Sequence, residues 1–205
     1  MNQTIKKIIK PFYIFFKYLI SKHKSNKFVN SRKEIFLELG AGDKKGKNGW
    51  ITIDWMKNCD IFWDLRKGIP FPNESVSGIY SSHFFEHLAY KEGQVFLDEC
   101  LRVLKPSGTF SICVPDAGKY IEGYLKHELD AKFLGYKPAY NCTTKIDYIN
   151  YIAYMDGHHK YMFDEENLVH LLQAKGMKNA RLRGFDPSLD LKVRAFESIY
   201  AIAEK

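Results

Sequence analysis

The sequence lacks any closely spaced pair of cysteines. Its four cysteines are far apart and form no CxxC motif: Cys59, Cys100, Cys113 and Cys142. Zinc sites and disulfide frameworks usually show such closely spaced cysteines in the sequence, so neither is expected here. Because disulfides persist mainly in oxidising compartments, we expect a protein of the reducing cytoplasm.

The sequence also lacks an apolar run long enough to cross a bilayer. A transmembrane helix needs about 20 consecutive, mostly apolar residues, and the most apolar segment near the N-terminus is interrupted by Lys10 and Lys17. That segment has no small-residue cleavage pattern either, which argues against a signal peptide.

Acidic residues are absent from residues 1–33, which hold nine of the 31 lysines and arginines. The remaining 22 basic residues face 24 acidic ones, so residues 34–205 are close to neutral although the chain carries a net charge of +7. A nucleic-acid-binding domain should be basic over its body, and no nucleic-acid partner is expected. We divide the chain into an N-terminal arm, residues 1–33, and one domain, residues 34–205, long enough to bury a full core.

The arm has the pattern of a basic amphipathic helix. Apolar residues recur with helical spacing on one face: Ile5, Ile8, Ile9, Phe12, Phe16, Leu19 and Ile20. Lysines 6, 7, 10 and 17 fall on the opposite face. Two interpretations stay open: residues 5–20 lie in the plane of a membrane surface, or the apolar face packs on its own domain or on a partner. Pro11 is expected to kink this helix or to mark its first turn.

From residue 35 onward, short apolar strands alternate with helical stretches, which is typical of an α/β protein with a mostly parallel sheet. The expected strands cover residues 35–39, 50–54, 60–63, 77–81, 109–114, 180–185 and 197–203, and the expected helices cover residues 90–104 and 165–174. Pro106 and Gly108 mark the end of the first helix, whereas Asp164 is the expected N-cap of the second and Gly176 its stop.

Residues 117–163 contain eight of the thirteen tyrosines and show weak periodicity. They follow the fifth strand and so belong at the carboxyl edge of the sheet, where ligands bind in open α/β folds. We interpret them as a substrate lid, with a helical hairpin that extends the core as the alternative.

The stretch "LELGAGDKKGKNGWITID" reads as a strand, a glycine turn and a second strand that ends in Asp54. Gly40 and Gly42 let the backbone approach a ligand closely, and Asp54 is positioned to accept hydrogen bonds from both hydroxyls of a ribose. Asp64 follows the third strand, where it can reach the exocyclic amine of an adenine. A dinucleotide site is disfavoured because the third glycine of GxGxxG is missing and only ten residues, 40–49, separate the strands.

Two further segments follow in order, "IPFPNESVSGIYSSHFFEHL" and "FLDECLRVLKPSGTFSICVPD". Together with "LELGAG" and Asp54, they make residues 35–116 resemble class I S-adenosylmethionine (SAM)-dependent methyltransferases of the methyltransferase type 11-like kind. The short connection at residues 40–49 resembles a subgroup in which a loop replaces the first helix. The resemblance implies a Rossmann-like sheet of about seven strands, SAM as cofactor and S-adenosylhomocysteine (SAH) as product.

The resemblance also implies which residues contact the cofactor: Glu38, Gly40, Ala41, Gly42, Asp54, Asp64, Leu65, Ser82 and His83. Glu38 and Gly40 would border the methionine end and Asp54 the ribose. Asp64 and Leu65 would frame the adenine, and Ser82 and His83 would line the face from which the methyl group leaves. Trp55 either stacks on the adenine or belongs to the core.

Methyl transfer from a sulfonium is a direct displacement, so the protein must align the acceptor and, for a hydroxyl, remove a proton. The candidate bases are His83, at the end of a strand, and His158 and His159, of which at most one is expected to be catalytic. His87 would share a helix face with His83 and is interpreted as a helix-capping or packing residue. No metal is expected, because neither a cysteine pattern nor an HExxH motif accompanies His83, Glu86, His87 and Asp116.

We therefore expect O-methylation of a small polar or glycan-type acceptor. The resemblance implies a role in polysaccharide biosynthesis, and membrane contact by the arm would suit a lipid-linked or cell-surface glycan. The alternatives are a non-catalytic SAM-binding regulatory module and a methyltransferase that acts on a protein, lipid or quinone. The sequence leaves the acceptor atom and the oligomeric state open.

Overall fold

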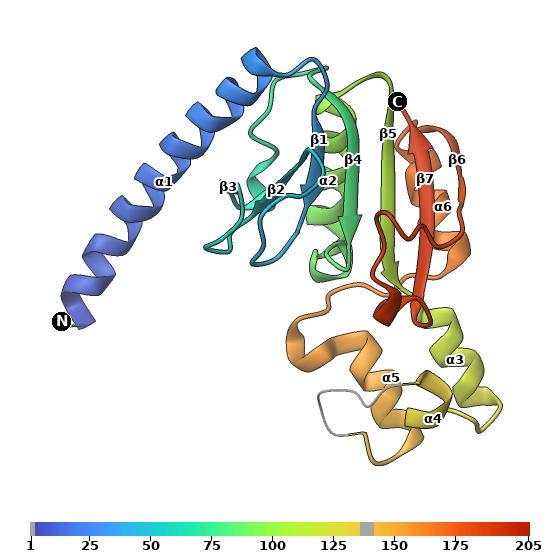
Figure 1. Cartoon of the computed structure of the whole chain (residues 1–205). Helices are drawn as coiled ribbons and strands as arrows, with labels where there is room; N and C mark the ends of the chain where they lie inside the picture. The colour runs from blue at the N-terminus through green and yellow to red at the C-terminus, as the bar shows by residue number, and fades with distance from the viewer. Residues whose placement is uncertain (1–2, 136–141) are drawn as a thin grey trace.

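The protein is described by a computed structural model that covers residues 3–135 and 142–205, with side chains from residue 11 onward. Its centre is a seven-stranded sheet with the order β3-β2-β1-β4-β5-β7-β6 (Figure 1). The strands are β1 (Phe36–Leu39), β2 (Trp50–Asp54), β3 (Ile61–Phe62), β4 (Val76–Ser82), β5 (Leu104–Pro115), β6 (Lys178–Leu182) and β7 (Ser198–Glu204). All neighbouring pairs are parallel except those of β7, which runs antiparallel to β5 and β6. The predicted mostly parallel α/β sheet is confirmed.

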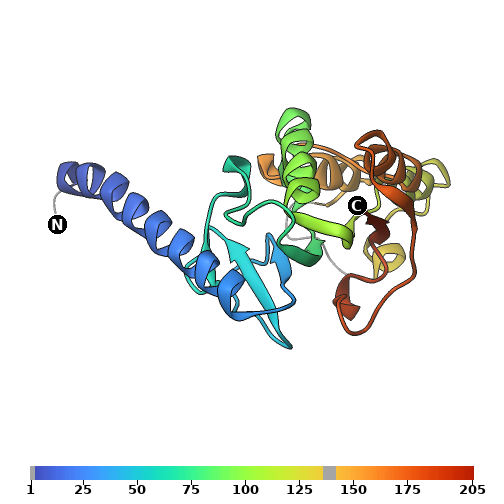
Figure 2. The same cartoon turned by 90° about the horizontal axis from the view of Figure 1, so that it is seen from above.

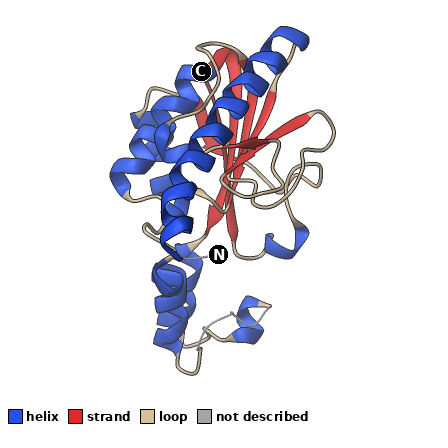
Figure 3. Ribbon diagram, turned by 90° about the vertical axis from the view of Figure 1, so that its left-hand side faces the viewer, coloured by secondary structure: helices blue, strands red, loops and turns tan. Residues whose placement is uncertain are grey.

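Two helices cover one face of this sheet. Helix α2 (Tyr90–Val103) and helix α6 (Glu165–Ala174) lie on the same side, while connecting loops cover the other side (Figures 2 and 3). Helix α6 has the predicted bounds, and Asp164 caps it by accepting a hydrogen bond from the backbone N–H of Asn167 at 2.7 Å. The chain passes from α2 directly into β5 at Leu104, before Pro106 and Gly108.

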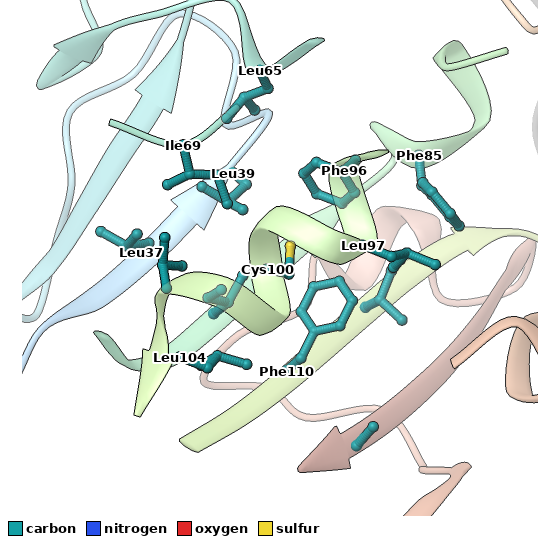
Figure 4. Close-up of a cluster of buried hydrophobic side chains, with 14 of the residues drawn as sticks. Leu37, Leu39, Leu65, Ile69, Phe85, Phe96, Leu97, Cys100, Leu104 and Phe110 are labelled. Carbon is teal, nitrogen blue, oxygen red and sulfur yellow. The ribbon is translucent and has the colours of Figure 1, made fainter. Parts of the chain in front are cut away.

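The main core lies between the sheet and α2. Figure 4 shows how Phe96, Leu97 and Cys100 of α2 point toward Leu37 of β1 and Phe110 of β5. All five side chains are completely buried. This burial follows from the sequence pattern, because parallel strands covered by helices read as nearly continuous apolar runs.

The connection between β1 and β2 contains no helix, and a carboxylate holds it in place instead. Oδ2 of Asp60 accepts hydrogen bonds from the backbone N–H of Gly46 at 2.9 Å, and from the N–H and Oγ1 of Thr52 at 3.1 and 3.0 Å. The loop is thereby tied to the strand that it leads into.

Strand β6 differs from the prediction of residues 180–185. It begins at Lys178, which pairs with Glu204, and it contains a register shift next to Asn179, whose φ is 53°. It ends at Leu182, after which Arg183 forms an ion pair with Asp190 at 2.6 Å. Backbone pairing with β7 determines where β6 begins, and the ion pair with Asp190 follows its last residue. The prediction had rested on the positions of apolar side chains alone.

The arm forms one long helix, α1 (Gln3–Ser31), that continues through Pro11. Pro11 therefore does not mark the first turn. The C-terminal half of α1 packs along β3: the Tyr18 ring lies 4.5 Å from that of Trp63, and Ser21 Oγ donates a hydrogen bond to the carbonyl of Phe62 at 2.8 Å. Ser25 is buried behind Ser21. No helix among the described residues is long and apolar enough to cross a membrane.

The predicted apolar face of α1 does not make this contact. Phe12 is 64% exposed, Phe16 60%, Leu19 49% and Ile20 55%, and the first half of the helix projects away from the sheet (Figures 1 and 2). Packing of α1 on its own domain through that face was therefore a wrong alternative, since the helix docks through its other side.

Residues 117–135 and 142–163 lie beyond the carboxyl ends of β4 and β5 (Figure 1). They form α3 (Ala117–Leu125), α4 (Ala131–Leu134), α5 (Lys145–Tyr154) and a 3-10 turn, η3 (Met155–Gly157). Six buried side chains make a separate small core, namely Ala117, Tyr120, Leu129, Leu134, Tyr148 and Ile152, whereas Phe163 at the end of the segment is buried in the main core. The described part of the segment is thus helical, and most of its buried side chains do not extend the main core. Tyr136 and Tyr140 lie outside the described residues.

Candidate active site

A cavity of about 460 Å³ opens at the carboxyl edge of the sheet. Its walls come from the turn after β1, the end of β2, the segments that follow β2, β3 and β4, and residues 157–160. The lining residues are Gly40, Gly42, Asp54, Trp55, Met56, Trp63, Asp64, Leu65, Arg66, His83, Phe84, His87, Leu88, Gly157, His158 and Lys160. Six of the nine residues predicted to contact the cofactor are among them: Gly40, Gly42, Asp54, Asp64, Leu65 and His83.

The two glycines of the turn have different roles, although each has a φ of +70°. A Cβ on Gly40 would lie 2.2 Å from Cγ of Phe84, so this glycine lets the turn pack against the residue after His83. A Cβ on Gly42 would meet nothing within 4 Å, and this glycine instead leaves room in the cavity.

Asp54 is held at the end of β2 by backbone donors. Its Oδ2 accepts a hydrogen bond from the N–H of Gly42 at 2.9 Å, and its Oδ1 accepts one from the N–H of Met56 at 3.0 Å. Each carboxylate oxygen has two lone pairs, so each keeps one for a ligand. Asp54 is only 8% exposed, which fits a fixed acceptor at the cavity wall.

Asp64 does not end a strand but caps the short 3-10 helix η1 (Leu65–Lys67). Arg66 binds both of its oxygens, with Nε and Nη2 each at 2.9 Å. Burial raises the pKa of Asp64, but the hydrogen bonds from Arg66 outweigh this and lower it overall. The Arg66 guanidinium also lies 5.1 Å from the ring of Trp55, which is 59% exposed and therefore not part of the core.

Three other predicted contacts do not line the cavity. Glu38 pairs with Lys44 at 2.6 Å, and Ala41 and Ser82 stand beside lining residues without facing the cavity themselves. Their roles toward a cofactor stay predictions.

His83 stands at the end of β4 with a φ of 50°. Its Nε2 lies 2.7 Å from Oγ of Ser198, and that hydroxyl donates its own proton to the carbonyl of Arg194 at 2.7 Å. Nε2 must therefore carry the hydrogen, and Nδ1 keeps the lone pair. Burial is the main reason why the pKa of His83 falls to about 3, so the ring is neutral near pH 7.

Comparison with known proteins agrees with this geometry. Residues 57–112 match the family described as "Methyltransferase domain". This match covers 56 of the 205 residues, and that part of the chain is similar to a methyltransferase domain. No curated protein sequence matches the chain.

Solved structures show the same fold at low sequence identity. A SAM-dependent methyltransferase from Archaeoglobus fulgidus is 16% identical, with a TM-score of 0.52 over 95% of this chain and 100% of that one. One from Mesorhizobium loti is 13% identical, with a TM-score of 0.51 over 83% and 90%. The Burkholderia thailandensis 1,6-didemethyltoxoflavin-N1-methyltransferase, bound to that compound and SAH, is 14% identical, with a TM-score of 0.50 over 92% and 78%.

A second cavity of about 350 Å³ lies beside the first, since His83 lines both. It is lined by His83, Pro115, Tyr151, Ile152, Met155, His159, Val193, Arg194 and Glu197. The two neighbouring histidines, His158 and His159, each line a different cavity. His158 lines the first, whereas His159 is buried at the second and its Nδ1 lies 2.7 Å from the carbonyl of Ile152.

The sequence predicted that His87 and His83 share one face of a helix. This prediction is wrong. The left-handed backbone at His83 precedes a single 3-10 turn, η2 (Phe85–His87), so no α-helix links the two histidines. Glu86 lies between them instead: its Oε1 is 3.7 Å from Nδ1 of His83 and 3.8 Å from Nε2 of His87. Glu86 is only 2% exposed, and burial raises its pKa to about 8.

Sequence reasoning missed several residues of this candidate site. Arg66 and Phe84 line the first cavity, and Arg194 lines the second. Arg66 had a local signal, since it stands two residues after Asp64 in a tight turn. Nothing in the local sequence around Arg194 indicates the cavity.

Proposed function

We propose that this methyltransferase moves the methyl group of SAM onto a hydroxyl of a small polar or glycan-type acceptor. The observation that supports this most directly is the position of His83, which lines both the cavity with the glycine turn and the cavity beside it. A group at that boundary can contact the donor on one side and the acceptor on the other.

In this proposal the first cavity holds SAM. The backbone N–H of Gly42 and the carboxylate of Asp54 form one wall, with the free lone pairs of Asp54 available to the ribose hydroxyls. Trp55 and Leu65 offer apolar surface for the adenine. SAM supplies an activated methyl group, so these residues have to bind and orient it.

The acceptor occupies the second cavity. Tyr151 and Val193 give it an apolar wall, and Arg194 and Glu197 bring charged groups to the same space. An aromatic ring beside hydrogen-bonding groups suits the mixed surface of a sugar or another polyhydroxylated molecule. The acceptor hydroxyl must lose its proton as the methyl group arrives, and we propose His83 as the base, with His158 and His159 as the alternatives. Because Ser198 and the Arg194 carbonyl fix the hydrogen on Nε2, the accepting atom of His83 is Nδ1.

We further propose that α1 brings the enzyme to an anionic membrane surface. Exposed apolar side chains of this helix are Phe12, Tyr13, Phe15, Phe16, Leu19 and Ile20. Phe12, Phe16 and Leu19 lie on the helix face opposite Ser21, which contacts β3. The arm contains nine basic and no acidic residues, which complements anionic lipid headgroups. Aromatic side chains beside lysines are typical of helices that lie in the interface. A lipid-linked glycan would be presented at such a surface.

The decisive experiment is transfer of labelled methyl groups from SAM into a lysate of the source cells, separated into glycan, lipid, protein, RNA and small-molecule fractions. We expect label in the glycan or small-molecule fraction only, with the Asp54→Ala enzyme as blank. Label in the protein or lipid fraction would contradict the proposed acceptor class. No label in any fraction, together with retained SAH binding, would favour a regulatory module.

A further inference from the structure

Three side chains beside the proposed active site bring potential metal ligands together. One nitrogen or oxygen atom from each of Glu86, His87 and His159 lies within 4.8 Å of the other two. Two separate segments supply them: Glu86 and His87 come from η2, and His159 follows η3. The backbone N–H of Lys160 joins the segments by donating to the carbonyl of Glu86 at 2.7 Å.

Both imidazoles are oriented by backbone carbonyls. Nδ1 of His87 lies 3.0 Å from the carbonyl of His158, and Nδ1 of His159 lies 2.7 Å from that of Ile152. A carbonyl only accepts hydrogen bonds, so each Nδ1 carries the hydrogen and each Nε2 of the neutral ring keeps a lone pair. Metal-binding histidines are held in the same way, with the second ring nitrogen donating to a carbonyl or carboxylate.

When Glu86 is ionised, its carboxylate has hydrogen-bond acceptors around it where it needs donors. Its Oε1 faces Nδ1 of His83 at 3.7 Å and Nε2 of His87 at 3.8 Å, and both of these nitrogens carry lone pairs. Its Oε2 is buried, and no described residue donates a hydrogen bond to it. A buried oxygen without a donor is costly, and a cation placed among these atoms would remove that cost.

We propose that Glu86, His87 and His159 bind a divalent transition-metal ion. Two imidazoles and one carboxylate suit Zn²⁺ and other divalent first-row transition metals, whereas Mg²⁺ and Ca²⁺ prefer oxygen ligands alone. Ligand atoms held at about 2.0–2.2 Å from one ion stand roughly 3.5 Å apart. Side-chain rotations that move the ligand atoms by about 1 Å would therefore bring them to metal-binding distance. Three protein ligands leave coordination positions for water or for an oxygen of a bound molecule.

The cluster lies at the meeting of the two cavities, since His87 lines the first and His159 the second. The sequence could not indicate it, because His159 stands 72 positions after His87 and no short motif links them. Ion binding is a property of these three side chains and does not depend on the identity of the acceptor.

The test is a titration of the full-length, chelator-treated protein with Zn²⁺, followed by calorimetry, with Co²⁺ as a spectroscopic probe. We expect one ion per chain and visible Co²⁺ absorption bands of a low-coordinate site. Glu86→Gln keeps the shape of the side chain and should weaken Zn²⁺ binding about 10-fold or more, and His159→Ala should do the same. His170→Ala, which removes an exposed histidine elsewhere, should leave binding unchanged.

Circular dichroism melting of each variant separates lost binding from lost folding, and His87→Gln at the half-exposed ligand replaces any variant that unfolds. Equal Zn²⁺ affinity in the folded Glu86→Gln and wild-type proteins would overturn the proposal. So would the absence of stoichiometric binding at millimolar Zn²⁺, in which case Glu86 is buried as the neutral acid. Neither measurement needs SAM or an acceptor, so its outcome is independent of the methyl-transfer assay.

Discussion

The backbone N–H of Gly42 donates a hydrogen bond to Oδ2 of Asp54 at 2.9 Å. The glycine turn and the strand-terminal carboxylate are therefore one structural unit. The turn positions the carboxylate, and the carboxylate fixes the turn.

Asp54→Ala should reduce SAH affinity by about 10- to 100-fold, because it removes the charged acceptor proposed for the ribose and hydrogen bonds to charged groups contribute roughly 1.5–3 kcal/mol each. Calorimetric titration with SAH measures this. Asp54→Asn keeps one carbonyl oxygen and should give an intermediate loss. Unchanged affinity in a folded Asp54→Ala protein would place the ribose elsewhere.

The two turn glycines should respond differently to alanine. Gly42→Ala should fold with a penalty of about 1 kcal/mol for its positive φ and lose SAH affinity, since the new Cβ points into open cavity space. Gly49→Ala is the matched control, because Gly49 has a φ of +87°, equally open surroundings and no contact with the cavity. Gly40→Ala should lower thermal stability severely, since its Cβ would lie 2.2 Å from Phe84, and Phe84→Ala should partly rescue it. Equal SAH affinity of the Gly42 and Gly49 variants would contradict the proposed approach of the cofactor.

His83→Ala should lower turnover about 10²- to 10⁴-fold, the usual contribution of a general base, while SAH binding stays within a few-fold of wild type. Turnover with the acceptor from the labelling experiment measures this, with the exposed His127→Ala as control. If His83→Ala kept most of its turnover, the base would be sought at His158 or His159.

Replacing Phe12, Phe16 and Leu19 together by serine should abolish sedimentation with vesicles that contain anionic phosphatidylglycerol. Melting should hardly change, because these three side chains are about half to two-thirds exposed. Replacing Leu125 and Val193 together by serine is the control for the loss of exposed apolar surface alone. These two side chains are 72% and 87% exposed and lie outside α1. Equal sedimentation of the triple variant and wild type would exclude this helix face as the membrane contact.

Asp60→Asn should cost about 1–3 kcal/mol at pH 7, since Asp60 holds the loop that replaces the first crossover helix. Burial raises the pKa of Asp60, but hydrogen bonds from Thr52 and Gly46 and the charge of Lys45 lower it overall. A depressed folded-state pKa stabilises the protein above the unfolded value of about 3.9 and loses that effect as pH falls toward the folded value. Urea unfolding at pH 7 and 3.5 should thus show the difference between Asp60→Asn and wild type narrowing at the lower pH. Glu128→Gln, at an exposed site, should show little difference at either pH.

Local sequence was sufficient for the strands that form the cavity. The apolar runs before Gly40 and Asp54 are periodic and end in turn residues, so both strand ends and the cavity position could be predicted. His83 shows the limit of such reasoning. Its positive φ depends on the tertiary structure around it, and a reader of "SSHFFEHL" expects an α-helix that would place His83 and His87 on one face.

Long-range partners were equally invisible in the sequence. Asp60 and Asp190 look like ordinary loop carboxylates, yet one anchors the turn region and the other binds Arg183 and the hydroxyl of Tyr80. Glu86 carries no sequence signal of burial, yet it is 2% exposed, and its carbonyl accepts a hydrogen bond from the backbone N–H of the distant Lys160. These roles are decided by which loops meet, and composition and periodicity carry no signal for that.

The docking of α1 on β3 has a consequence for local stability. Strand β3 consists of two residues, Ile61 and Phe62, at the edge of the sheet, so α1 rests on the part of the sheet with the fewest backbone pairings. Amide hydrogens of α1 should therefore exchange with solvent through local detachment, faster than those of β4 and β5, which need global opening. The arm is in this sense a separate cooperative unit, able to change its surroundings while the catalytic sheet stays folded.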